Sequence, residues 1–205
     1  MSLLRPLPLL PAALAPAMPA AGTAPAAPGG FTAESEKFLA AWHGWRGPAP
    51  HTALLPRRAQ VDLVSICRLM PQLAVLEVRG PDKAVFRLAG TEIESQFGAP
   101  LTGCNAVKLA PPEQQLQRGR RLWQMVQQPC AAVLRLTVEH LSGRHDDVEI
   151  AAAPVLPDEA GAPVQVFAVL SRLPRQRWGE SDPITRNMTR NLRFLDIGAG
   201  LPAKI

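Results

Sequence analysis

Apolar residues alternate with polar ones, or form short continuous runs, in five stretches of the chain, and these stretches predict five β-strands. The first two cover residues 73–78 and 84–88, and the turn-forming sequence between them predicts a hairpin. The other three lie in the last third of the chain, over residues 130–140, 148–155 and 164–173. Breaks at residues 142–143 and 157–163 separate them, so we expect an antiparallel meander.

Helical periodicity appears between and before these strands. Thr32 can cap a helix whose first turn carries Glu34 and Glu36, and an apolar stripe follows at helical spacing. The stripe consists of Phe38, Leu39, Trp42 and Trp45. Further helices are predicted at residues 63–70, 91–97 and 111–128, with a turn or another helix at residues 101–109.

A last helix is predicted after Asp182-Pro183, ending at Gly198. It would place three apolar residues on one side and three arginines on another. The apolar residues are Met188, Leu192 and Leu195, and the arginines are Arg186, Arg190 and Arg193.

The element order predicts an α+β fold: a five-stranded antiparallel sheet with a helical block on one face and an N-terminal helix on or near the other. Residue parity assigns the inner face of the sheet to Leu76, Val78, Phe86, Leu88, Leu134, Leu136, Val138, Val148 and Ile150. The outer face would carry Val75, Val133, Phe167 and Val169. This apolar outer face needs a cover, which the stripe of Phe38, Leu39 and Trp42 would supply from the same chain or from a second copy. We therefore assign an interaction role to Phe38, Leu39, Trp42, Phe167 and Val169.

Composition divides the chain into three parts. Seven of the 22 prolines fall within residues 1–30, so we expect a disordered leader there, and Pro8 and Pro11 interrupt any secretory signal. Residues 31–174 would form the folded domain and residues 175–205 a basic tail. The three cysteines show neither a disulfide framework nor zinc-binding spacing, and no apolar run is long enough to span a membrane. A reducing, cytoplasmic location fits this composition.

The net charge of +5 raises the alternative of a regulatory protein that binds nucleic acid or an anionic surface through the arginines of the last helix. The chain has no tyrosine, and few aromatic residues lie beside the basic ones to stack on bases. This distribution argues against nucleic acid and favours a solvated basic surface, including Arg118, Arg120 and Arg121.

Three short motifs occur in order along the chain. They are Leu55-Pro56-x-Arg58-x-x-x-Asp62, Arg87-Leu88-Ala89-Gly90-Thr91-x-Ile93 and Leu101-Thr102-Gly103. Together, with Pro129 before the third strand, they resemble a bacterial PAS-domain family, PAS family 5. The resemblance implies a cytoplasmic sensory or protein-interaction module in signal transduction, with a protein partner or self-association as a dimer. One departure is Asp62-Leu63, where the family often has an aspartate-proline pair.

The resemblance also implies a small-molecule pocket, for which the candidate residues are Phe86, Leu88, Cys104, Trp123, Leu136 and His140. Flavin photosensors of this fold carry Asn-Cys-Arg-Phe, whereas this chain reads Cys104-Asn105-Ala106-Val107, so we interpret Cys104 as an ordinary half-buried thiol. His140 is either a haem or metal ligand or, more commonly for a strand end, a histidine bonded to backbone groups. The sequence requires no cofactor and leaves the ligand open.

The remaining polar residues predict structural roles and no catalysis. Arg58 and Asp62 would pair at four-residue spacing, and Arg87 would pair with an acidic neighbour. Ser142, His145 and Asp146 all fall in one predicted turn, so they cannot form a triad across a cleft. No nucleophile elbow, phosphate loop or His-Glu-x-x-His motif occurs, which predicts a protein that is not an enzyme.

Overall fold

The computed structural model describes residues 30–48, 53–173 and 182–202. The predicted leader, apart from Gly30, and the start of the predicted tail lie outside these residues. The helical elements are α1 (Ala33–Trp45), η1 (Arg58–Gln60), η2 (Cys67–Gln72), α2 (Thr91–Phe97), η3 (Ala106–Leu109) and α3 (Pro112–Gln127). The strands are β1 (Leu73–Gly80), β2 (Lys83–Ala89), β3 (Cys130–His140), β4 (His145–Val155), β5 (Gln165–Leu173) and β6 (Ile184–Asp196).

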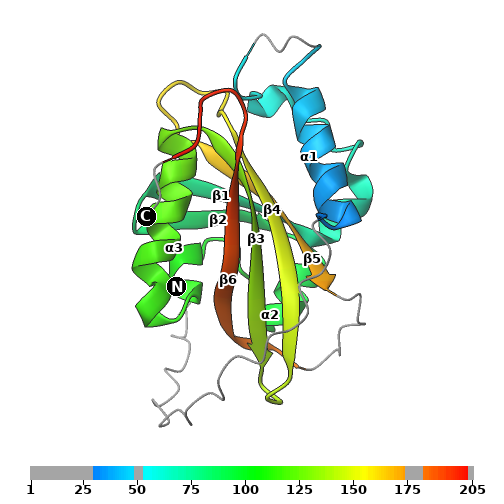
Figure 1. Cartoon of the computed structure of the whole chain (residues 1–205), viewed down its shortest axis with the longest axis vertical. Helices are drawn as coiled ribbons and strands as arrows, with labels where there is room; N and C mark the ends of the chain where they lie inside the picture. The colour runs from blue at the N-terminus through cyan, green and yellow to red at the C-terminus, as the bar shows by residue number, and fades with distance from the viewer. Residues whose placement is uncertain (1–29, 49–52, 174–181, 203–205) are drawn as a thin grey trace, which may run out of the picture. The chain divides into compact units, whose positions relative to one another are not determined.

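The strands form one antiparallel sheet in the order β2-β1-β5-β4-β3-β6 (Figure 1). The five predicted strands, the β1–β2 hairpin and the β3–β4–β5 meander are confirmed. Strand β4 begins at His145, so residues 145–147, which were predicted to lie in a turn, belong to the strand. The sheet has one strand more than predicted.

The sixth strand replaces the predicted last helix. β6 pairs with β3 from Cys130↔Asp196 to His140↔Ile184, with register shifts that leave Thr185 and Arg190 as extra residues. Four residues of β6 line a cavity beneath the inner face of the sheet, and they are Ile184, Asn187, Thr189 and Leu192. Their spacing of three, two and three residues differs from the strict alternation of a regular strand. The prediction of a helix was therefore wrong because two bulges hide the strand period.

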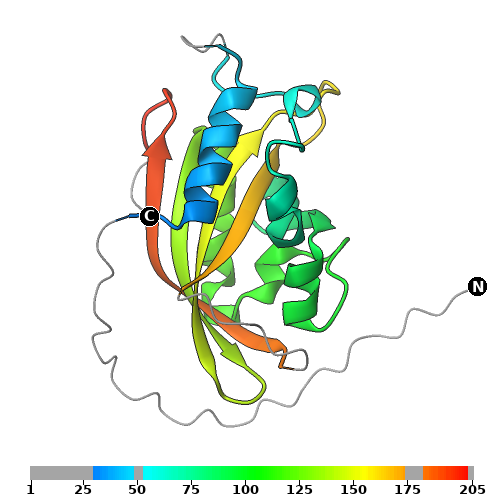
Figure 2. The ribbon, with the colours of Figure 1, turned by 90° about the vertical axis from the view of Figure 1, so that its right-hand side faces the viewer.

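Helix α1 covers the outer face of the sheet (Figure 2). Thr32 caps it as predicted, since its hydroxyl accepts a hydrogen bond from the Ser35 backbone N–H at 3.2 Å. The outer-face cluster includes Phe38, Leu39, Trp42, Phe167 and Val169. All five are buried by their own chain, so of the two covers predicted for the outer face the structure has the one from the same chain.

Elements α2, η3 and α3 lie against the inner face. Most of the predicted inward residues are found there, with Leu76, Val78 and Phe86 in one buried cluster and Val138 and Val148 in another. Leu88 is the exception, because it packs with the outer cluster. A register shift pairs Val75 with Leu88 and Leu76 with Phe86, so Arg87 is an extra residue that reverses the parity after it.

Two of the three motifs make contacts that position neighbouring elements of the fold. In the first, the Arg58 backbone N–H bonds to the Leu156 carbonyl at 2.8 Å, and its guanidinium lies over the Phe167 ring. Asp62 accepts a hydrogen bond from the Val64 backbone N–H, where an ion pair with Arg58 was predicted. In the second, a Cβ on Gly90 would lie 2.3 Å from the Pro71 carbonyl oxygen, so only glycine fits between η2 and α2.

The predicted Arg87 pairing is confirmed, with Glu77 at 3.3 Å. The short helix predicted at residues 63–70 is instead the 3-10 helix η2, which includes Pro71 where the prediction ended the helix before it. Within the described residues, no helix combines the length and apolar character needed to cross a bilayer.

Candidate functional site

A cavity of about 160 Å³ lies between the inner face of the sheet and the helices α2 and α3. Its walls are mostly apolar and come from both layers. They include Leu76 and Phe86 of the first hairpin, Leu136 and Ile150 of the central strands, and Ile93 and Met125 of the helices. A dry cavity of about 150 Å³ with apolar walls accepts a benzene-sized molecule, so this one suits a single ring or a short branched chain.

Two of the six candidate pocket residues, Phe86 and Leu136, line this cavity. Leu88 lies on the other face of the sheet for the reason given above. Trp123 lines a separate depression beside Val78 and Val164. Cys104 is half-buried in the inner cluster with its sulfur 3.8 Å from the Pro100 carbonyl oxygen, and it is outside the cavity wall. The cavity size and the position of Cys104 do not fit a flavin that forms an adduct with this thiol.

The cavity has one polar side, where Arg118 and Arg121 of α3 face Asn187 and Thr189 of β6. Arg118 donates hydrogen bonds to the Ala106 carbonyl at 3.3 Å and to the side-chain oxygen of Asn187. Asn187 is 4% exposed and donates in turn to the Leu109 carbonyl at 3.0 Å. The Arg118 guanidinium is thus fixed by neutral acceptors.

The two arginines of this side are half-buried, and their burial affects their pKa values. Burial lowers the pKa of Arg118 to about 10, and the positive charge of Arg121 adds to the effect. Burial also lowers the pKa of Arg121. In the ranges that the structure describes, no carboxylate forms an ion pair with either guanidinium. Two cations therefore border an apolar cavity without an opposite charge.

Gln96 of α2 is a further polar group on the cavity wall. The side chain is 5% exposed, and its Oε1 has no hydrogen-bond partner among the described residues. Buried amide oxygens in proteins are nearly always bonded, and an unbonded one costs free energy. Gln96 is thus a buried polar group that has capacity for a ligand.

Polar contacts join α3 to β6 beside the cavity. The Arg186 guanidinium lies 2.6 Å from the Glu113 carboxylate, and the Thr189 backbone N–H donates to the Gln114 side chain at 3.3 Å. Arg190 and Arg193 make other contacts, with the Thr137 hydroxyl and the Phe31 ring. The three arginines predicted to share one helix face therefore lie on a strand and contact three different parts of the chain, and these contacts do not support the nucleic-acid alternative.

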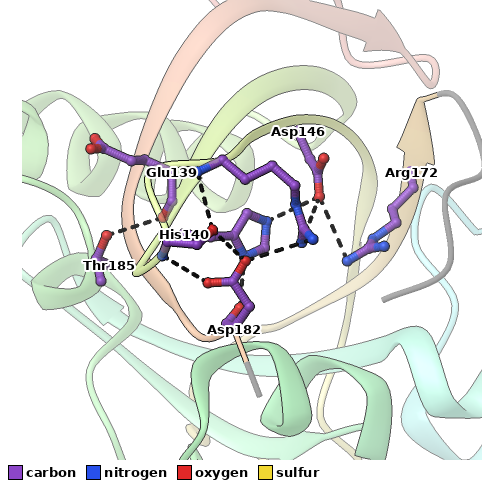
Figure 3. A network of polar contacts seen from close by, with 8 residues as sticks. Glu139, His140, Asp146, Arg172, Asp182 and Thr185 are labelled. Carbon is purple, nitrogen blue, oxygen red and sulfur yellow. Dashed lines mark hydrogen bonds and ion pairs between the residues drawn. The ribbon is translucent and has the colours of Figure 1, made fainter. Parts of the chain in front are cut away.

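His140 belongs to a polar network at the far end of the sheet (Figure 3). Its Nδ1 lies 2.8 Å from the Asp182 carbonyl oxygen, and its Nε2 lies 3.0 Å from the Asp146 carboxylate. Arg144 and Arg172 also approach Asp146, at 3.3 and 3.8 Å. Because both ring nitrogens are engaged and the ring is 1% exposed, this histidine is a structural residue and not a ligand of the cavity.

Arg172 shows how strongly this network is buried. Burial lowers its pKa to about 10, even though the carboxylate of Asp146 acts in the opposite direction. The described residues contain no group of three or more histidine, cysteine or acidic side chains arranged to hold a metal ion. Through the contacts of His140, Asp146 and Arg172, the network ties the starts of β4 and β6 to the ends of β3 and β5.

A second buried charge anchors α1. The Glu149 carboxylate on the outer face accepts hydrogen bonds from the Thr32 backbone N–H at 2.7 Å and from the Thr32 hydroxyl at 2.9 Å. Its other oxygen lies 3.2 Å from Arg135. Burial acts to raise the pKa of Glu149, but the hydrogen bonds from Thr32, Ser35 and Arg135 together bring it below the ordinary value.

Sequence reasoning missed the polar side of the cavity. Arg118 and Arg121 were interpreted with Arg120 as a solvated basic surface, and Gln96 and Asn187 were not singled out. A signal was present for the arginines, because residues 118, 121, 122 and 125 share one face of a helix and two of them are apolar. Of the three, Arg120 is exposed, whereas Arg118 and Arg121 are half-buried.

Comparisons with known proteins identify the family of this chain. A family model described as PAS domain matches residues 31–171. Among solved structures, the LOV protein of Rhodobacter sphaeroides matches 56% of this chain and 70% of its own, at 14% identity and a TM-score of 0.40. An RNA-binding light-oxygen-voltage receptor matches 62% of this chain and 36% of its own, at 19% identity and a TM-score of 0.39. Among curated proteins, none gives a significant match. The family match confirms the resemblance carried by the three motifs, and the chain belongs to the PAS domain family.

Proposed function

We propose that this chain is a non-catalytic PAS sensor that binds a small molecule in the cavity between the sheet and α3, and that a protein partner reads the bound state. PAS domains are sensory and signalling modules. The observation that carries the proposal is the apolar cavity with one polar side, which lies where a folded core would ordinarily be filled.

The route of the signal follows from the contacts at the polar side. Arg118 reaches Asn187 of β6, and the Glu113–Arg186 pair joins the same two elements. A ligand that displaces Arg118 from Asn187 would loosen or shift β6 against α3. The outer face is less suited to this role, because α1 already covers it. A partner, or a second copy of the chain, would therefore contact α3 and β6.

The location proposed for this sensor is the cytoplasm. All three cysteines are free, and Cys67 is exposed, which suits a reducing compartment.

The experiment is hydrogen exchange of the full chain with and without a small probe. Toluene, benzyl alcohol and benzoate are the probes, each titrated to saturation or to its solubility limit. We expect at least one to raise the melting temperature, as any ligand that binds only the folded state does. Backbone exchange should change in α3 and β6 and remain constant in α1.

A variant with the cavity filled provides the control. Ala168 lies on the cavity wall, and Ala168→Leu should abolish the effect of every probe while the protein stays folded. If no probe binds the unmodified chain, or if Ala168→Leu responds like the unmodified chain, the proposed sensor function is wrong.

A further inference from the structure

We propose that the ligand is a small monocarboxylate with one ring or a short branched chain, and that Arg118 and Arg121 bind its carboxylate while the apolar walls hold its body. This inference rests on the proposed function, since it names the class of molecule for the same cavity.

The first argument is charge. Arg118 and Arg121 lie one helical turn apart on the cavity wall, and each has its pKa lowered by burial. A cation in apolar surroundings is costly unless an anion accompanies it. The nearby Glu113 is engaged with Arg186 at 2.6 Å, so the described residues supply no such anion to the cavity. A ligand carboxylate would provide the missing negative charge.

The second argument is hydrogen-bonding capacity. A guanidinium has five N–H donors, and the two acceptors that Arg118 contacts, Ala106 and Asn187, are both neutral. The planar guanidinium suits a carboxylate with two parallel hydrogen bonds, which are stronger than bonds to neutral acceptors. An anion can therefore compete with Asn187 for Arg118, which is the movement that the proposed signal requires.

The third argument comes from a different element. Gln96 projects from α2, is 5% exposed, lines the same cavity and has no hydrogen-bond partner for its Oε1 within the described ranges. A half-turn of the amide would present its NH2 group to the cavity, where it can donate to a carboxylate oxygen. Gln96 would then make a hydrogen bond in the occupied protein that the free protein lacks.

The size of the cavity restricts the ligand. About 160 Å³ is comparable to the volume of about 150 Å³ that holds benzene, and is too small for a nucleotide or a long-chain fatty acid. The apolar walls exclude a bare anion such as inorganic phosphate, which has no apolar surface to bury. Benzoate has the charge, the planar carboxylate and the single ring, and it serves as the probe.

The test is isothermal titration of benzoate, toluene and inorganic phosphate into the full chain and two variants. Arg121→Gln removes one cation of the cavity, and Arg120→Gln removes its exposed neighbour on the same helix with the same change in net charge. We expect Arg121→Gln to weaken benzoate binding about tenfold or more, the loss typical of one hydrogen bond between charged groups. Arg120→Gln should leave it unchanged, and toluene binding should not respond to either variant.

A conservative variant separates charge from shape. Arg121→Lys keeps the positive charge and loses the planar pair of donors, so it should bind benzoate with intermediate affinity. Melting temperatures of the free proteins verify that all variants fold. Raising the salt concentration should weaken benzoate binding and leave toluene binding constant.

The remaining outcomes distinguish a failure of the carboxylate inference from a failure of the proposed sensor function. If toluene binds and benzoate does not, or if Arg121→Gln and Arg120→Gln bind benzoate equally, the carboxylate inference is wrong while the sensor cavity stands. Phosphate binding as tight as benzoate binding would also overturn the inference. If neither toluene nor benzoate binds, the carboxylate inference fails, and the sensor proposal fails with it when benzyl alcohol does not bind either.

Discussion

The two faces of the sheet differ in how completely they are covered. On the outer face, α1 buries Phe38, Trp42 and Phe167 so fully that none has an exposed surface. On the inner face, α2 and α3 leave a cavity bordered by the cations of Arg118 and Arg121. Complete packing adds stability, whereas a cavity and unpaired charges reduce it. The comparison indicates that the outer face stabilises the fold, and it agrees with the proposal that the inner face binds a ligand.

The largest effect that would test this comparison is the loss of the α1 contact. Trp42→Ala removes a fully buried ring and the hydrogen bond from its Nε1 to the Pro154 carbonyl at 2.9 Å. We expect the free energy of unfolding to fall by about 3–5 kcal/mol in urea denaturation, the range for large aromatic residues in cores. Leu116→Ala, at an exposed position of α3, is the control and should change it by less than about 0.5 kcal/mol. An equal effect of the two substitutions would contradict the role assigned to the outer face.

A matched pair of smaller changes compares the faces directly. Ala151 lies in the outer cluster and Ala168 on the cavity wall, and both are buried. Ala151→Leu should destabilise the protein by about 1–3 kcal/mol, because the outer face has no room for added methylene groups. Ala168→Leu should cost much less, since its side chain enters the cavity. Both values come from the same denaturation experiment, and a larger loss for Ala168→Leu would mean that the inner face is the tighter one.

The smallest expected effect concerns pH and the attachment of α1. The pKa of Glu149 lies below its ordinary value in the folded protein, so its ionised form stabilises the fold. This contribution is fully present above the unfolded-state pKa of about 4.3 and is lost as the pH falls through the folded-state value. Glu149→Gln should reduce the free energy of unfolding by about 1–2 kcal/mol at pH 7 and flatten its dependence on pH below 5. Thermal denaturation between pH 3 and pH 7 measures both, and an unchanged acid dependence in the variant would exclude Glu149 as its source.

Much of the fold could be predicted from the sequence because regular alternation and helix caps are local signals. Thr32 marks the start of α1, and five strands appear where apolar and polar residues alternate or apolar runs are bounded by turns. Two of the failures share one cause: bulges at Arg87, Thr185 and Arg190 break the alternation, so Leu88 was assigned to the wrong face and β6 to a helix. A bulge depends on pairing with a distant strand, which local sequence does not show.

The site was less predictable than the fold. Phe86 and Leu136 were found because parity places large apolar residues on the inner face. Arg118 and Arg121 were missed because an arginine on a helix ordinarily faces water, and the contact of Arg118 with Asn187 depends on the position of β6 against α3. Gln96 gives no sequence signal, since its unbonded amide is evident only from its burial. Long-range packing therefore makes the polar side of the cavity.

The bulges of β6 have a second effect, on aggregation. β6 ends the sheet, and the edge of a sheet exposes backbone groups to which a foreign strand can add. Irregular pairing and the charged Arg190 and Arg193 make this edge a poor template for such addition. A foreign strand therefore fits this edge poorly, which protects the chain against edge-to-edge aggregation.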